Sequence, residues 1–342
     1  MMYPPPQRIH APELRADFWF NSRPLRIQDA AGSAVLLVFW DYTSAASLEL
    51  IPVVKEWHRR YAGAGLHVIG IHSPEFDFAR DENEVNIAIA ALKIDFPVAT
   101  DNTRSMLYAY QVQQIPTVVL IGRDGSIYSV FGGLHNCEQV ERSIHVLLRE
   151  MGNYGELPTL LGQFHSEEST GYQRPSPAMR TGYLHGALGN MEGYSPELPA
   201  QYLDRGYQVE GKFYIEGKWT ARAESLEFGG DEAGHLVFRY IGRSVQAVLG
   251  SLTPGAVVEI RHDGISLTPL QGGKDILRSE CGMTTVVIDR PKLYQIVALK
   301  ELEEHQLMFI PFTEGVSFYS FTFEWHSALT AGLSDSSPIF TN

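Results

Sequence analysis

A continuous apolar run over residues 35–40 is the feature that most constrains this sequence. Its residues, Val-Leu-Leu-Val-Phe-Trp, lack the polar alternation of a half-exposed strand, so they predict a strand covered on both faces. Apolar residues then recur every three or four positions from Leu48 to Tyr61, which indicates an amphipathic helix. Because such a strand needs other layers on both sides, the first part of the chain is predicted to be an α/β structure.

The alternation of strand and helix signals continues to residue 150. Further elements are predicted as a strand over 67–72, a helix over 81–92, a hairpin over 117–131 and a helix over 137–150. The order β-α-β-α-β-β-α predicts an α/β sandwich with a mixed sheet, and we assign it residues 1–153.

The remaining chain has a different pattern. Residues 154–206 are rich in Gly, Pro and Tyr, and their spaced aromatic residues favour a connecting arm that docks on a domain surface over a free linker. Residues 207–328 show strand after strand without a helix, which predicts a β-sandwich of jelly-roll type. The Asp263-Gly264 pair marks a hairpin turn within it. Residues 329–342 form a C-terminal tail.

Composition limits the classes of binding partner and the cellular location that we expect for this chain. Lys and Arg number 27 against 40 Asp and Glu, and the net charge of −13 argues against a nucleic-acid partner. No apolar run is long enough to span a membrane, and no export signal is visible, so we expect a cytoplasmic protein. Cys137 and Cys281 are too few for a disulfide scaffold. The histidines show no metal-ligand spacing, and we predict no metal or other cofactor.

Two short motifs carry a family resemblance. Residues 40–47, Trp-Asp-Tyr-Thr-Ser-Ala-Ala-Ser, follow the first strand, and residues 114–117, Gln-Ile-Pro-Thr, precede the hairpin. This pairing resembles the redox loop and the cis-proline loop of the thioredoxin superfamily. Residues 51–57, 70–76, 171–174 and 318–323 are similar to the C-terminal region of DipZ-type thiol:disulfide oxidoreductases. The resemblance implies a thioredoxin-like domain followed by a jelly roll that resembles a carbohydrate-binding module.

The resemblance places the two redox cysteines of that family at Ser44 and Ser47. Dithiol exchange needs a thiolate nucleophile, and a serine hydroxyl forms no disulfide. We therefore expect this chain to be inactive in dithiol exchange, with no functional catalytic residue. Two origins stay open, natural loss of the cysteines or a Cys-to-Ser form of an active oxidoreductase. Because Ala45 and Ala46 also depart from the usual middle residues of such motifs, natural loss is favoured.

The resemblance also implies a binding groove that needs no cysteine. Its expected residues are Trp40, Tyr42, Thr43, Ile115 and Pro116, with a protein or peptide as the partner. A purely structural role is equally compatible with Trp40 and Tyr42, and Ser44 is expected to cap the following helix. Glycan binding through the β-sandwich is a further alternative. The aromatic residues that would serve it, Trp219, Tyr240, Tyr294 and Trp325, are more often core residues at alternating strand positions.

Overall fold

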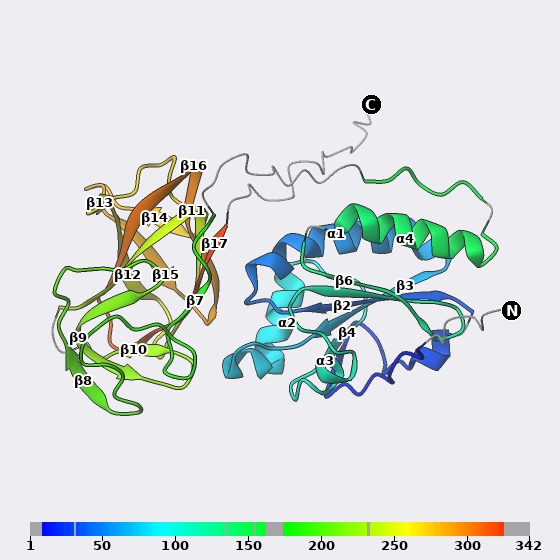
Figure 1. The fold of residues 1–342 in the computed structure, drawn as a ribbon, viewed down its shortest axis with the longest axis horizontal. Coiled ribbons are helices and arrows are strands. Elements are labelled where there is room, and N and C mark those ends of the chain that lie inside the picture. Colours follow the sequence, from blue (N-terminus) through cyan, green and yellow to red (C-terminus); the bar gives the residue numbers. More distant parts are fainter. Residues whose placement is uncertain are drawn as a thin grey trace, which may run out of the picture. The chain divides into compact units, whose positions relative to one another are not determined.

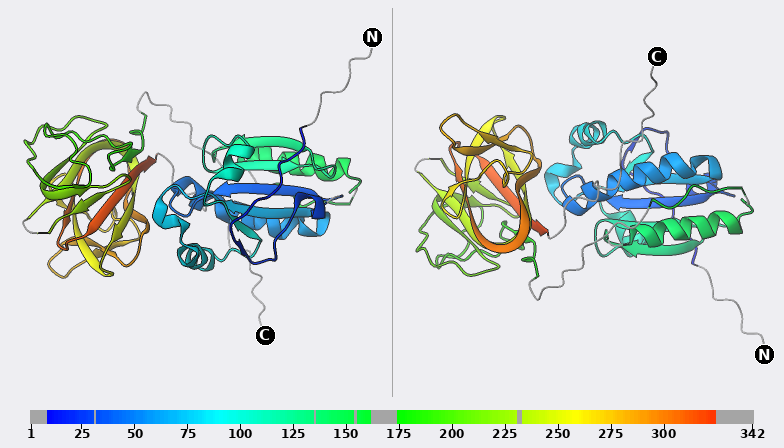
Figure 2. Two further views of the ribbon diagram at one scale, coloured as in Figure 1. Left: turned by 90° about the horizontal axis from the view of Figure 1, so that it is seen from below. Right: turned by 90° about the horizontal axis from the view of Figure 1, so that it is seen from above.

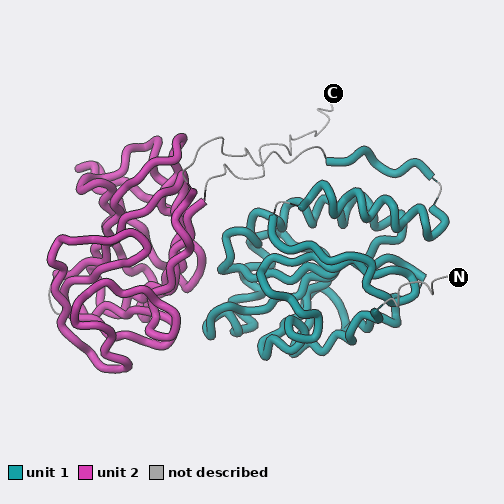
Figure 3. The backbone as a smooth tube through the Cα atoms, in the orientation of Figure 1, with its two compact units in different colours: residues 1–166, 328–342 teal, residues 167–327 magenta. Residues whose placement is uncertain are grey.

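The computed structural model describes residues 9–30, 32–134, 136–153, 155–161, 174–230 and 233–324. They form two compact units, whose described residues are 9–161 and 174–324 (Figure 3). Part of the family motif at 171–174, Trp325 and the predicted tail at 329–342 lie outside the described residues. Among the residues described, no helix is long and apolar enough to cross a membrane.

The first unit is built on a mixed sheet (Figure 1). Its strand order is β1 (Trp19–Phe20), β4 (Val98–Thr100), β3 (Leu66–His72), β2 (Ala34–Trp40), β5 (Thr117–Ile121) and β6 (Ile127–Gly132). Strands β2, β3 and β4 are parallel, whereas β1, β5 and β6 run antiparallel to their neighbours. The predicted mixed α/β sheet is confirmed.

Helices lie on both faces of this sheet (Figures 1 and 2). They are α1 (Ala45–Tyr61), α2 (Glu82–Ala91), α3 (Ser105–Ala109) and α4 (Cys137–Glu150), with short 3-10 turns η1 (Ile27–Ala30), η2 (Ala62–Ala64) and η3 (Asp77–Arg80). The three predicted helices are confirmed. The sequence missed β4 and α3, because elements of three and five residues are too short to show a hydrophobic period.

Strand β2 is the centre of this unit, and all seven of its residues are buried. Its even-numbered residues pack into one apolar cluster with α1, α2 and α4, while its odd-numbered residues pack into a second cluster with α3 and η1. This division follows from the alternation of side chains along a strand. The predicted coverage of both faces is therefore correct, and one strand supplies the middle of two cores.

The second unit is all β, and every pair of its named strands is antiparallel. The strand order is β14 (Ile276–Arg278), β15 (Thr284–Ile288), β12 (Ala256–His262), β16 (Lys292–Pro311), β11 (His235–Ser251), β17 (Val316–Glu324), β10 (Leu226–Phe228), β9 (Phe213–Ala221) and β8 (Pro199–Tyr202). Strand β13 (Ile265–Ser266) joins β12, and β7 (Met179–Arg180) joins β17. Strand β11 also pairs with β9, so the sheet folds back over a single apolar core. This all-β unit agrees with the predicted sandwich.

Three of these strands are longer than the sequence predicts. The sequence predicts separate short strands at 209–214 and 219–223, at 235–240 and 245–249, and at 294–299 and 306–311. Each of these pairs corresponds to one strand, namely β9, β11 and β16. In the last two, the predicted gaps face each other: Ile241 pairs with Glu304, and Gly242 with Glu303. Polar residues hide the period of two here, and the ladder itself is irregular, because its register shifts from Gly242–Glu303 to Ser244–Ala298.

The predicted connecting arm at 154–206 does not form one segment in the structure. Residues 155–161 lie in the first unit, where the amide of Leu161 donates to the buried carboxylate of Glu141 at 2.8 Å. Residues 174–206 contribute β7 and β8 to the second sheet, with Met179 and Tyr202 in its core. The all-β unit thus includes strands that precede residue 207.

Asn190 ties part of this segment to the second sheet. Its buried amide nitrogen donates to the carbonyls of Leu203 at 3.1 Å and Ile215 at 2.8 Å. Its amide oxygen accepts from the Ile215 amide at 2.9 Å. One side chain therefore satisfies three backbone groups that belong to different parts of the unit.

We predict that Asn190→Leu lowers the free energy of unfolding by about 1–3 kcal/mol, because it leaves buried backbone groups without partners. Chemical denaturation checks this. Gln201→Leu is the matched control, since Gln201 is exposed on β8 and its replacement should change stability by about 0.5 kcal/mol or less. Equal stability of the two variants would contradict the role given to Asn190.

Candidate functional site

The loop after β2 and the residues before β5 lie at one edge of the first sheet. Phe39 pairs with Thr117, so Trp40 and Pro116 each stand one residue further towards that edge. The parallel register brings His72 of β3 to the same edge, as the partner of Trp40. Because the carboxyl ends of parallel strands lie here, this edge is where α/β folds usually place a binding site.

The buried carboxylate of Asp41 fixes the loop that follows β2. It accepts hydrogen bonds from the amide and the hydroxyl of Thr43, at 3.0 and 2.7 Å, and from the amide of Glu75 at 2.7 Å. His72 Nε2 lies 3.4 Å from Asp41 Oδ1, and the His72 ring stacks on Tyr42 with centroids 5.4 Å apart. Asp41 thereby links the loop internally, through Thr43, and connects it to the segment after β3, through Glu75.

The hydroxyls at the two redox-cysteine positions both accept from backbone amides. Ser44 is the N-cap of α1, as predicted, and its Oγ accepts from the amide of Ser47 at 3.3 Å. Ser47 is fully buried, and its Oγ accepts from the amide of Asp41 at 3.3 Å. Each serine therefore stabilises the start of the helix or the loop before it.

Most of the expected groove residues are buried in the free chain. Trp40, Tyr42, Thr43 and Pro116 are all buried, whereas Ile115 and Ser44 are partly exposed. The Ile115–Pro116 peptide bond is cis. The five expected groove residues, together with Ser44 and Ser47, thus lie at one edge of the sheet. Most of these seven side chains are buried.

Ile115 leaves its backbone polar groups open. Strand β5 begins at Thr117, whose hydroxyl donates to the carbonyl of Gln114 at 2.7 Å, and the carbonyl of Pro116 accepts from Gly133 at 2.8 Å. Within the described part of the chain, no hydrogen bond reaches the amide or the carbonyl of Ile115. The Ile115 amide can therefore donate a hydrogen bond to a bound ligand, and the Ile115 carbonyl can accept one, beside the half-buried Ile115 side chain.

Neither of the two cysteines belongs to the segment that holds Ser44 and Ser47. Cys137 begins α4, its thiol donates to the carbonyl of Leu134 at 3.2 Å, and burial raises its pKa to about 12. Cys281 is exposed in the second unit, where a hydrogen bond with Ser279 lowers its pKa. Both are free thiols, and they belong to different units.

The aromatic residues expected for sugar stacking lie in the core of the second unit. Trp219 and Tyr240 are fully buried and Tyr294 is 1% exposed, so their ring faces pack on protein. Trp325 lies outside the described residues. Alternation along the strands turned these side chains inward, and none of the three is open to a glycan.

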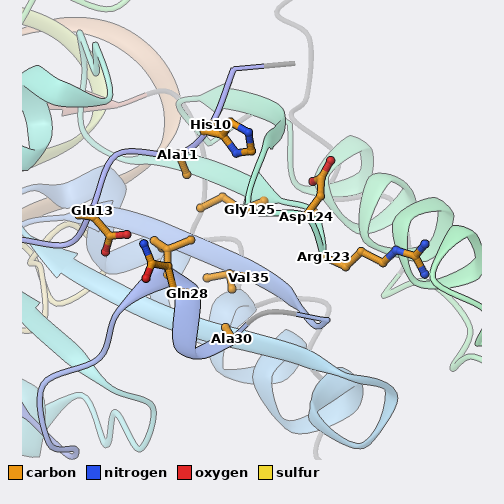
Figure 4. Close-up of a pocket in the computed structure, with 12 residues that line it drawn as sticks. His10, Ala11, Glu13, Gln28, Ala30, Val35, Arg123, Asp124 and Gly125 are labelled. Carbon is orange, nitrogen blue, oxygen red and sulfur yellow. The ribbon is translucent and has the colours of Figure 1, made fainter. Parts of the chain in front are cut away.

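A cavity of about 500 Å³ lies at the other end of β2 (Figure 4). His10, Glu13 and Gln28 line it from the N-terminal segment, with Arg123 and Asp124 from the turn between β5 and β6. Val35, near the start of β2, forms part of its wall. It is therefore separate from the edge that holds Ser44 and Pro116.

Comparisons with known proteins agree with this fold. A family model described as thioredoxin-like matches residues 32–127, and one described as a thioredoxin-like C-terminal domain matches residues 182–323. The chain is 24% identical over 333 residues to Protein DipZ of Mycobacterium tuberculosis, covering 92% of this chain and 42% of that protein. It is 29% identical over 121 residues to the thiol-disulfide oxidoreductase ResA of Bacillus thuringiensis, covering 35% of this chain and 67% of ResA. A solved thiol-disulfide isomerase from Corynebacterium glutamicum superposes with a TM-score of 0.37 at 24% identity, covering 42% of this chain and 98% of the isomerase.

The sheet order and the family models give a thioredoxin-fold protein, and its first unit is similar to thiol:disulfide oxidoreductases. Over most of its length the chain is DipZ-like, since the match to DipZ runs through both units. The chain spans less than half the length of the DipZ proteins that it matches.

We predict that the chain does not catalyse the reduction of insulin by dithiothreitol. The site holds hydroxyls at both redox positions, and burial keeps Cys137 protonated. Insulin turbidity measured against a sample without protein checks this. A Cys137→Ala, Cys281→Ala double variant is the control for stray thiols, and turnover in the unmodified chain above either sample would contradict the prediction.

Proposed function

We propose that this thioredoxin-fold protein has lost dithiol exchange and binds an extended segment of another protein beside Ile115. The single observation that carries the proposal is the open amide and carbonyl of Ile115 at the edge that also holds Ser44 and Pro116. The proposal has a chemical part and a binding part, and each has its own support.

The chemical part rests on what occupies the redox positions. Neither serine carries sulfur, and each hydroxyl is engaged with a backbone amide. Activation of a serine as a nucleophile would need a base in hydrogen-bond contact with it. Among the described residues none contacts Ser44, and the buried His72 ring lies against Asp41 and Tyr42 instead. The site is therefore better suited to binding than to bond breaking.

The binding part rests on the backbone. A segment in strand conformation can donate to one open carbonyl and accept from one open amide, which is how proteins add a strand to an exposed edge. Such contacts depend little on the bound sequence, because they use main-chain groups. The half-buried Ile115 side chain adds an apolar contact next to them. Binding of this kind requires no cysteine at position 44 or 47.

We predict that Ile115→Pro weakens peptide binding about three- to tenfold, because it removes one amide donor. The probe is the S-alkylated insulin B chain, an extended peptide without free thiols, and fluorescence anisotropy measures its affinity for the full chain. Ile115→Val is the matched control, since it keeps the amide and most of the apolar surface; its affinity should stay within about twofold of the original.

Thermal unfolding of both variants separates binding from stability. If Ile115→Pro remains folded and binds the B chain as well as Ile115→Val does, the open amide is not the contact point. Failure of the unmodified chain to bind at all would also contradict the proposed function.

The alternative origin of the serines has its own test. We predict that Ser44→Cys combined with Ser47→Cys gives measurable insulin reduction, because a thiol at the N-terminus of α1 has its thiolate stabilised by the helix dipole. The single variant Ser44→Cys is the control, since one cysteine cannot close an intramolecular disulfide. A folded double variant without activity would show that the surroundings of the motif have also diverged.

A further inference from the structure

Strands β12, β16 and β11 are neighbours in the second sheet and bring two histidines together. Tyr240 of β11 pairs directly with His305 of β16, and His262 of β12 pairs with Leu307, two residues further along β16. The rings of His262 and His305 lie with their centroids 4.4 Å apart. The histidines are far apart in sequence, and only the sheet register makes them adjacent.

Asp263 completes this cluster from the turn between β12 and β13. Its Oδ2 lies 2.8 Å from Nδ1 of His305 and 3.7 Å from Nδ1 of His262. One donor atom from each of the three residues lies within 4.8 Å of the other two. Two imidazole nitrogens and one carboxylate oxygen therefore converge on a single point.

Further contacts orient each member of the cluster. Nε2 of His262 is 3.0 Å from the Tyr240 hydroxyl, which leaves Nδ1 as the nitrogen that faces Asp263. Oδ1 of Asp263 accepts from the Gln306 amide at 2.8 Å, so Oδ2 is the oxygen turned to the histidines. Metal-binding histidines and carboxylates commonly have such partners on the atom that does not bind the ion.

We propose that His262, Asp263 and His305 bind a divalent transition-metal ion of the zinc class. Zinc prefers nitrogen and oxygen donors in tetrahedral arrangement, whose donors are about 3.3–3.5 Å apart at the usual bond lengths. The two His–Asp separations of 2.8 and 3.7 Å bracket this value, and the donor atoms of the two histidines lie within 4.8 Å of each other, so side-chain rotations can bring all three to one ion. Two imidazoles argue against Mg²⁺ and Ca²⁺, which take oxygen ligands.

The cluster is buried on one side and reachable on the other. His262 is 3% exposed, whereas the Asp263 side chain is 49% exposed. His305 also lines a cavity of about 350 Å³, together with Glu303 and Lys300. Three protein ligands leave a fourth position of a tetrahedral ion open, and that position would take water or an anionic ligand from solvent.

The test uses the full chain without an affinity tag, after dialysis against a chelator. Co²⁺ is the probe, because its visible absorption reports binding and a low coordination number, and Zn²⁺ is added afterwards in competition. We expect one Co²⁺ per chain, displaced by one Zn²⁺. Asp263→Asn should weaken binding at least tenfold, and His305→Gln at least a hundredfold.

Asp263→Asn is the more informative variant because it preserves the turn. Asp263 has a φ of 51°, a conformation that Asn adopts readily, and the Asn oxygen can still accept from Gln306. His235→Gln is the matched control, since His235 also contacts a carboxylate, Asp204, at 3.2 Å, and no third donor joins this pair within the described part of the chain; the affinity should not change. The absence of saturable Co²⁺ binding, or equal affinity in Asp263→Asn and the unmodified chain, would overturn the proposed site.

Discussion

Burial of β2 on both faces is the constraint on which the first unit depends. Because its side chains alternate between two apolar clusters, helices must lie on both sides of the sheet, and the strand cannot shift by one residue without exchanging its two faces. The chain leaves this fixed strand at Trp40, and Asp41 immediately binds the backbone of the next turn and of the segment after β3. The candidate site is therefore positioned by a strand that is buried along its whole length.

Ser44 and Ser47 both fit where the loop after β2 meets α1. Oγ of Ser44 caps α1, and Oγ of Ser47 accepts from the amide of Asp41, so both hydroxyls have a backbone partner without sulfur. The geometry of the site therefore does not require thiols at positions 44 and 47. A chain can lose the thiols and retain the edge at Ile115, which depends on backbone groups and on the start of β5.

The sequence predicted those features whose signal is local. The run at 35–40, the cap at Ser44 and the turn at Asp263-Gly264 each depend on neighbouring residues, and the structure places all three as expected. Features that depend on residues far apart in the sequence were not predicted. Strands β11 and β16 were each predicted as two short strands, because polar residues of both meet where the ladder between them shifts register.

Non-local arrangement also explains what the sequence could not show about sites. Spacing rules found no metal ligands, because His305 joins His262 and Asp263 only through the pairing of β12 with β16. The burial of Trp40 and Tyr42 depends on α1, α2 and His72, and a motif alone does not reveal which side of the loop these partners cover. The two motifs correctly predicted which edge of the first sheet brings residues 40–47 and 115–116 together. Tertiary packing determines which of their atoms stay exposed, and the motifs do not show this.

The long strand β11 affects how the second unit unfolds. It forms ladders with β16, β17 and β9, so its backbone groups are shared among three partners along its length. Local opening of any one neighbour leaves β11 held by the other two, and its release requires all three ladders to separate together. Residues 245–249 lie between β16 and β17, so their amides should exchange with solvent only in global unfolding, and this half of β11 should be the last part of the unit to open.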